Sequence, residues 1–203
     1  MQGQLWIVAA PSGGGKTSLI AEAVRVLDDV VESVSHTTRA ARPGEIEGVH
    51  YFFVAPSEFQ AMIDADGFLE YAQVFHNAYG TAAASVDALL AAGKDVILSI
   101  DWQGAQQVMR RRPETRTVFL LPPSLDVLRE RLTTRGQDNA AVVAQRMAEA
   151  EEQISHYREF EFVIVNADFQ RAAGELQALI TSDRLRRARR EADLQPLLKR
   201  LGQ

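Results

Sequence analysis

The first segment with the residue types for chemistry is a glycine-rich turn, Ala10-Pro11-Ser12-Gly13-Gly14-Gly15-Lys16-Thr17. It follows an apolar run typical of a buried strand and precedes a helical pattern, which is the context of a phosphate-binding loop. Glycines let the backbone N–H groups turn inward and form an anion site at the start of a helix. In such a loop, Lys16 would reach the β- and γ-phosphates of a nucleoside triphosphate, and the Thr17 hydroxyl would hold Mg²⁺.

The loop departs from the strict pattern at its first position, where Ala10 replaces a glycine. The departure is mild, because alanine is the smallest residue with a Cβ. The alternative is a glycine-rich turn that caps a helix and binds nothing, but the Gly-Lys-Thr spacing after a strand favours triphosphate binding. The motif does not indicate which reaction follows.

A second segment, from Ser35 to Tyr51, carries the residue types for binding an acceptor's phosphate. Arg39 and Arg42 are three residues apart and are joined to a glycine-containing turn and to Tyr51. Guanidinium groups match phosphate oxygens, and a tyrosine hydroxyl adds a further donor. An exposed basic loop would explain the arginines but not the whole string.

That string, SHTTRAARPGEIEGVHYFF, resembles the acceptor-binding signature of the guanylate kinase family. The resemblance continues in order, at the family's spacings, through FLEYAQVFHNAYGT, VILSIDWQGAQQV, FLLPPS, RLTTRGQD and VIVNAD, and therefore covers nearly the entire chain. It points to bacterial members. It implies an ATP-dependent enzyme that transfers the γ-phosphoryl group to GMP, giving ADP and GDP, with Mg²⁺ as cofactor.

The resemblance also implies an acceptor site. The positions that match GMP-binding residues are Ser35, Arg39, Arg42, Tyr51, Glu70, Tyr79, Gly80, Thr81 and Asp101. Glu70 suits guanine, because a carboxylate only accepts and guanine offers N1–H and a 2-amino group side by side, while the Ser35 and Thr81 hydroxyls can donate to O6. Adenine would leave the carboxylate unpaired, and such sites reject it. Without the resemblance, Glu70 would be interpreted as a surface carboxylate on a strand edge.

On the donor side, the resemblance implies a longer set of ATP-binding residues: Ala10, Pro11, Ser12, Gly13, Gly14, Gly15, Lys16, Thr17, Ser18 and Asn166. Asn166 is expected near the adenine. Mg²⁺ would bind Thr17, with Asp101 acting through water. Asp101 follows an apolar strand, which is where open α/β sheets place ligand groups.

The transfer itself needs no strong base, because a GMP phosphate oxygen is already anionic near pH 7. Catalysis then depends on aligning the two substrates and on neutralising the charge of their phosphates. The implied catalytic residues are Lys16, Arg39, Arg131, Arg135 and Arg146, the last three from a lid and its flank; closure of the lid would exclude water. The alternative is that the lid arginines pair with helix carboxylates such as Glu130 and Glu149.

Three positions depart from the family's pattern. Ser99 stands two positions before Asp101, where relatives often carry a further acid. His76 and Ala78 replace residues that are often Gly and Tyr. Since Tyr79-Gly80-Thr81 is intact, we expect the acceptor site to be retained.

The elements that must position these residues alternate between short apolar runs and helical patterns. The expected strands are Leu5–Ala10, Val96–Ile100, Thr117–Leu121 and Phe162–Val165, and the clearest helical patterns are Thr17–Leu27 and Gln103–Arg111. This alternation predicts an α/β fold, with a P-loop parallel sheet flanked by helices, an inserted GMP-binding lobe of short strands and a small lid.

We expect one guanylate-kinase-like domain over residues 1–203. The core would comprise about 1–32, 82–132 and 147–190, the GMP-binding lobe about 33–81, the lid about 133–146, and a basic C-terminal tail 190–203. The polar part of the lid has no apolar anchor and is expected to be mobile. The basic residues near the C-terminus are expected to form a solvated helix end with i,i+4 ion pairs.

The overall composition restricts the classes of binding partner that we expect for this chain. The net charge of -5 argues against a general nucleic-acid binder, and the 203 residues contain no apolar run of the length a membrane helix needs. The absence of cysteine excludes disulfides and thiolate chemistry and is compatible with the cytoplasm. ATP and GMP are thus the expected partners, with neither nucleic acid nor membrane. A monomer and a homo-oligomer both stay open.

Three other functions deserve comparison. Guanylate-kinase-like modules of scaffold proteins bind peptides, but they typically lack the intact phosphate loop that this chain has. A kinase of phosphorylated sugars could share the core but would not need guanine-reading residues. A switch GTPase would carry an Asn-Lys-x-Asp motif, which this sequence does not contain.

Overall fold

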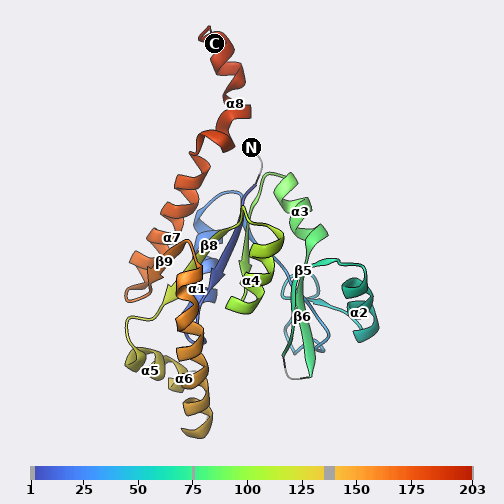
Figure 1. The fold of residues 1–203 in the computed structure, drawn as a ribbon, viewed down its shortest axis with the longest axis vertical. Coiled ribbons are helices and arrows are strands. Elements are labelled where there is room, and N and C mark those ends of the chain that lie inside the picture. The colour runs from blue at the N-terminus through green and yellow to red at the C-terminus, as the bar shows by residue number, and fades with distance from the viewer. Residues whose placement is uncertain (1–2, 75, 135–139, 203) are drawn as a thin grey trace.

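The computed structural model describes residues 3–74, 76–134 and 140–202. Figure 1 shows a central sheet between helices, a smaller sheet with α2 on one side of it, a helical arm formed by α5 and α6, and a C-terminal helix that projects from the body.

The central sheet has five strands, and every neighbouring pair is parallel. In spatial order they are β2 (Val30–Glu32), β7 (Asp95–Ser99), β1 (Leu5–Ala9), β8 (Arg116–Leu121) and β9 (Phe162–Val165). The predicted parallel sheet flanked by helices is therefore confirmed, and the four strands expected from apolar runs all belong to it. The edge strand β2 was not among the strands predicted for it.

Alternating side chains of β1 build two separate cores, one on each face of the sheet. Trp6 and Val8 pack with α1 (Lys16–Val26) and α7 (Phe169–Arg184). Leu5 and Ile7 pack with α3 (Ala83–Ala91) and α4 (Trp102–Arg111). Because β1 is buried on both faces, its sequence is uniformly apolar rather than alternating.

The smaller sheet is formed by residues between β2 and α3. Its strand order is β4 (Phe52–Phe53), β3 (His36–Thr37), β6 (Asn77–Ala82) and β5 (Phe68–Val74). Helix α2 (Pro56–Asp64) covers it through Phe59, which stacks on Phe68 at 4.5 Å between ring centroids. The pairing of β5 with β6 is irregular between Phe68 and Glu70, which alters the pairing next to a predicted ligand residue.

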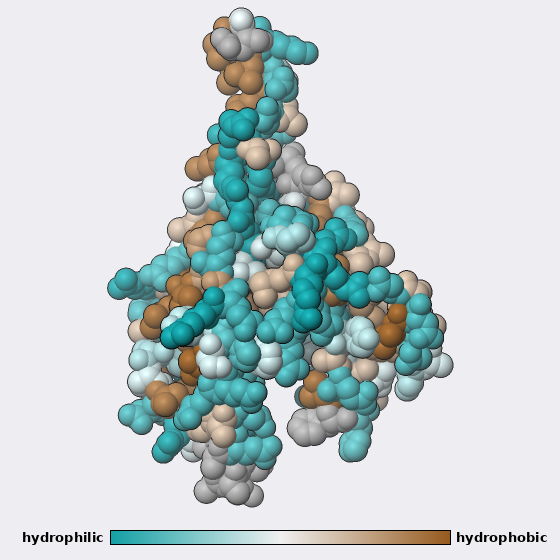
Figure 2. Space-filling view, viewed as in Figure 1, coloured by the Kyte–Doolittle hydropathy of each residue, from teal (hydrophilic) through white to brown (hydrophobic). Residues whose placement is uncertain are grey.

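The helical arm consists of α5 (Leu125–Thr134) and α6 (Ala140–Ser155), followed by the 3₁₀ helix η1 (His156–Glu159). Leu128, Leu132, Met147 and Ala150 form a small apolar core of its own. In Figure 2 the arm and the smaller sheet form two projections at the lower edge of the molecule, with a hollow between them. Among the described helices, none combines the length and the apolar character that crossing a membrane requires.

The C-terminal segment differs in part from the solvated helix end that we expected. Helix α8 (Arg187–Arg200) buries no residue and contains the expected i,i+4 pair between Arg187 and Glu191. The prediction of a solvated end is wrong for Arg184 and Arg189, because both form ion pairs with the buried Asp95 at the start of β7. These ion pairs attach the end of α7 and the start of α8 to the central sheet.

Candidate active site

The glycine-rich loop connects β1 to α1 and has the shape of an anion site. Gly13 and Gly15 have φ values of 81° and 89°, which favour glycine because a Cβ is strained there. The loop folds back so tightly that a Cβ on Gly14 would lie 2.9 Å from the Cβ of Ala10. Alanine is therefore tolerated at the first loop position because a glycine faces it.

Lys16 extends from the first turn of α1 to the end of β7, where its Nζ donates to the carbonyl oxygen of Ile100 at 2.9 Å. Burial lowers the pKa of Lys16 to about 8, although the nearby carboxylates of Asp101, Glu32 and Glu70 oppose that shift. The loop lysine is thus surrounded by acidic side chains in the ligand-free protein.

Asn166 connects the loop to the helical arm. Its Nδ2 donates to the carbonyl oxygen of Gly14 at 2.9 Å, and its own carbonyl accepts from Arg131 Nη2 at 3.0 Å. A Cβ on Gly15 would collide with the Asn166 amide. In the described structure the buried Asn166 side chain therefore braces the phosphate loop, a contact that the sequence did not predict.

A cavity of about 580 Å³ opens beside this contact and is lined by the loop and the arm. Gly13, Gly15, Ser18, Arg131 and Asn166 all contribute to its wall. Arg131 Nη1 is buried and has no hydrogen-bond acceptor among the described residues, which is uncommon for a guanidinium. Four of the predicted ATP-site residues and one predicted lid arginine thus line one cavity.

Glu70 is buried on β5, with 7% of the residue exposed. The Thr81 hydroxyl, on the neighbouring strand β6, donates to its Oε1 at 2.6 Å. Burial raises the pKa of Glu70, and the bond from Thr81 opposes this rise. A Cβ on Gly104 would lie 3.0 Å from Oε2, so the glycine leaves room for that oxygen.

Arg39 is held by Glu45, a residue that the sequence analysis did not single out. The Arg39 Nη2 and Nη1 atoms donate to the two Glu45 oxygens at 2.8 and 2.9 Å. This bidentate contact, together with the backbone N–H of Arg42, lowers the pKa of Glu45 to about 2. The Arg39 guanidinium lies 5.4 Å from the Tyr51 ring centroid, and Tyr51 and Tyr79 contact edge to face.

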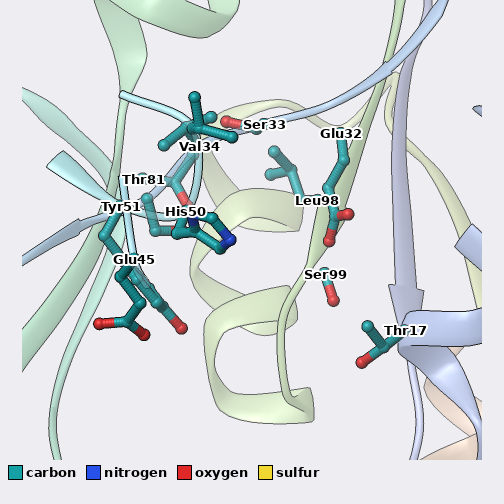
Figure 3. Close-up of a pocket in the computed structure, with 12 residues that line it drawn as sticks. Thr17, Glu32, Ser33, Val34, Glu45, His50, Tyr51, Thr81, Leu98 and Ser99 are labelled. Carbon is teal, nitrogen blue, oxygen red and sulfur yellow. The ribbon is translucent and has the colours of Figure 1, made fainter. Parts of the chain in front are cut away.

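Thr81, Glu45 and Tyr51 line one cavity of about 350 Å³ between the smaller sheet and the central sheet. In Figure 3, Glu45, Tyr51, His50 and Thr81 lie on one side of it, and Thr17, Ser99 and Glu32 lie on the other. Ser35 also lines it. Three of the predicted acceptor residues, Ser35, Tyr51 and Thr81, therefore share a single space with the loop threonine.

The remaining predicted residues have varied surroundings. Arg42 is exposed, and Arg146 on α6 is partly buried. A Cβ on Gly80 would lie 3.0 Å from the Phe68 ring, so a larger residue at this position would disturb the packing of the smaller sheet. Arg135 lies outside the described residues.

Asp101 is the N-cap of α4, and its Oδ1 accepts from the backbone N–H of Gly104 at 2.9 Å. Its side chain is otherwise exposed at the end of β7. Within the described ranges, no three His, Cys, Asp or Glu side chains come together to hold a metal ion by themselves.

Comparison with known proteins agrees with this geometry. A family model described as guanylate kinase matches residues 2–183. The guanylate kinase of Alkalilimnicola ehrlichii is 52% identical over 201 residues that cover 99% of both chains, and that of Hahella chejuensis is 50% identical over 97% of both. The crystal structure of guanylate kinase from Anaplasma phagocytophilum has a TM-score of 0.72 and 31% identity, covering 93% of this chain and 89% of that one.

Proposed function

Because the chain belongs to the guanylate kinase family, we propose that its two cavities bind the two substrates of that family's reaction. The reaction transfers the γ-phosphoryl group of ATP to GMP and gives ADP and GDP. GMP would occupy the cavity between the two sheets, and ATP would bind at the glycine-rich loop and in the cavity beside the arm.

The pairing of Glu70 with Thr81 is the observation that carries the assignment of GMP. A buried carboxylate is costly unless it is hydrogen-bonded, and the Thr81 hydroxyl donates to Oε1. The second oxygen can accept from the N1–H and 2-amino groups of guanine. Adenine offers neither donor at these positions, so it would leave Glu70 unpaired.

Arg39, Arg42, Tyr51 and Tyr79 would bind the GMP phosphate. Glu45 fixes the Arg39 guanidinium beside the rings of Tyr51 and Phe53. A guanidinium carries five N–H donors, so the bonds to Glu45 leave donors for phosphate oxygens. Pre-organisation of this kind lowers the cost of ordering the site on binding.

ATP phosphates would bind the backbone N–H groups of the glycine-rich loop, and Lys16 would exchange the Ile100 carbonyl for a phosphate oxygen. Arg131 and Arg146, on opposite helices of the arm, would add positive charge as the arm approaches the loop. The buried, unpaired Nη1 of Arg131 supports this role, because a bound anion is a natural acceptor for a guanidinium. Asn166 would then order the loop rather than contact the adenine alone.

The donor atoms near the loop suit Mg²⁺, which prefers hard oxygen ligands and retains several waters. The Thr17 hydroxyl faces the shared cavity, and the exposed Asp101 carboxylate could accept from a bound water. When bound, the ion would neutralise charge on the transferred phosphoryl group. Thr17 would hold it, while Lys16 and Arg39 would orient the reacting groups.

The peptide-binding alternative is less well supported by this site. Peptide recognition does not require a loop lysine held at the sheet edge or a buried carboxylate with a free oxygen, and both are present. We further propose a cytoplasmic enzyme whose partners are small nucleotides.

A coupled phosphotransfer assay with ATP and Mg²⁺ tests the proposal, with GMP compared against AMP, UMP and CMP. We expect ADP formation with GMP alone. Turnover of another acceptor would contradict the role of Glu70. Binding of ATP without turnover of any acceptor would favour a binding module.

A further inference from the structure

Glu32 is an acidic residue in the shared cavity that the reaction described so far does not use. It is the last residue of β2, the edge strand of the central sheet, and it pairs in register with Ile97 of β7. Figure 3 shows its carboxylate directed toward Ser99, with Thr17 beyond, so that the three residues follow one another along one wall. All three line the cavity.

The carboxylate is accessible to a ligand. The residue is exposed, and its open surface faces the cavity. Within the described part of the chain, it forms no ion pair. Its interactions there are with the Ser99 hydroxyl and, at longer range, with the charge of Lys16.

A carboxylate in this place, without an ion-pair partner among the described residues, conflicts with the proposed ligands. GMP and ATP are both polyanions, and like charges a few ångströms apart repel strongly in a partly enclosed site. The conflict disappears when a cation lies between the carboxylate and the phosphates. Thr17, at the other end of the same wall, is the residue that would hold such a cation.

Asp101 alone does not meet this requirement. Its Oδ1 accepts from the N–H of Gly104 as the cap of α4, so one of its two carboxylate oxygens already serves the fold. Asp101 follows β7, whereas Glu32 ends the neighbouring strand β2. The Ser99 hydroxyl, at the end of β7, can restrict the orientation of the Glu32 carboxylate.

We propose that Glu32, oriented by Ser99, is a positioning residue for Mg²⁺ and accepts hydrogen bonds from the waters of the ion beside Thr17. The inference rests on the proposed function, since it assumes a nucleotide-bound Mg²⁺ at the loop. The residue would act on the ion and not on the transferred phosphoryl group directly.

The test measures Mn²⁺ binding to the protein–ADP complex by electron paramagnetic resonance, for wild type and for Glu32→Gln. Glutamine keeps the shape and a bond to Ser99 but removes the charge. We expect Mn²⁺ affinity to fall about tenfold or more, as for other residues that support metal-bound groups. Metal-free ADP affinity should stay the same or rise, and the melting temperature should not change.

Two further variants make the result specific. Glu22→Gln removes a partly buried carboxylate on α1 that pairs with Arg25, and it should leave Mn²⁺ binding unchanged. Glu32→Gln combined with Ser99→Asp moves the carboxylate to the neighbouring strand and should restore most of the Mn²⁺ affinity.

Equal Mn²⁺ affinity in wild type and Glu32→Gln would overturn the inference, and so would a variant whose only defect is a raised KM for GMP, since Glu32 would then contact the acceptor. These measurements do not depend on GMP turnover. Normal Mn²⁺ binding without phosphotransfer would therefore count against the proposed function and leave the inference standing.

Discussion

The Thr81 hydroxyl donates a 2.6 Å hydrogen bond to Glu70 Oε1, so one oxygen of a buried carboxylate is fixed from within the protein. The other oxygen lies against Gly104 of α4, where a Cβ would approach it to 3.0 Å. Residues from the smaller sheet and from α4 thus surround the carboxylate and set the position of Glu70 Oε2, which can accept a hydrogen bond.

Glu70→Gln should lower kcat/KM for GMP about 10- to 100-fold, because a hydrogen bond to a charged acceptor is worth roughly 1.5–3 kcal/mol. ADP affinity should stay within a factor of two, since Glu70 lies outside the glycine-rich loop. Steady-state kinetics and ADP titration give the two values. A matching loss of ADP affinity would show that Glu70 maintains the structure and does not read guanine.

Gly104→Ala should separate stability from acceptor binding. Alanine favours a helix interior by about 0.5–1 kcal/mol over glycine, but here its Cβ would crowd Glu70 Oε2. We expect KM for GMP to rise several-fold without a fall in melting temperature. Gly174→Ala on α7 is the matched control, because no atom lies within 4 Å of its Cβ position, and its KM should be unchanged. An unaltered KM in Gly104→Ala would argue that Oε2 does not face the acceptor.

Nucleotide affinity should depend on the protonation of Lys16. Its pKa in the free protein is about 8, and a bound phosphate favours the charged form, so binding is favoured below pH 8 and weakens above it. Between pH 7 and pH 9 we expect metal-free ADP affinity to fall about tenfold, as measured by calorimetry. Lys16→Met should bind weakly at both pH values. Lys94→Met, which removes a surface ion pair with Asp29, should keep the wild-type dependence. A flat profile in wild type would mean that Lys16 is fully charged throughout.

Arg189→Ala should destabilise the fold although it changes a residue of the projecting helix α8. Arg189 pairs with Asp95 at 2.6 Å and with Asp183 at 2.8 Å, and both carboxylates are buried. Removing one partner of a buried ion pair costs roughly 3–5 kcal/mol, and we expect about 1–3 kcal/mol because Arg184, Arg116 and Arg186 remain. Urea unfolding gives the free energy. Arg190→Ala, at an exposed position of the same helix, should change it little, and equal effects of the two variants would point to helix propensity instead.

Sequence patterns predicted the central sheet well because its strands are short, apolar and bounded by turns. The run Phe162–Val165 coincides with β9, and the run Val96–Ile100 differs from β7 by one residue at each end. The edge strand β2 was not predicted as part of this sheet. It has only three residues and one buried side chain, too short for a periodic signal.

The site could be predicted only as far as the resemblance reached. Glu70 gives no signal by itself, because its burial arises when β6 and α4 close over β5. Asn166 and Gly14 are 152 positions apart, and their hydrogen bond follows from the order of β1, β8 and β9 in the sheet. The role of Glu45 was more accessible to prediction, since a carboxylate three residues after Arg42 in a turn can contact a neighbouring arginine side chain.

The arginines near the C-terminus show why charge patterns mislead. Helical spacing correctly indicates the pair of Arg187 with Glu191, whose effect is local. It cannot reveal that Asp95, 89 positions before Arg184, is a buried carboxylate at the start of β7. The basic composition of the tail is explained in part by the acidic residues that it covers.

The stacking of Trp102 on His156, with ring centroids 3.5 Å apart, joins the start of α4 to the residue that follows α6. The chain has two tryptophans, and the other, Trp6, is buried in the central sheet. The two tryptophans therefore lie in different parts of the molecule, so their fluorescence reports on different regions. Trp6 emission should report the integrity of the central domain, whereas Trp102 emission should change if its contact with the His156 ring at the base of the helical arm opens. The protein therefore carries its own optical probe of arm movement, and Trp6→Phe would isolate that signal without an added dye.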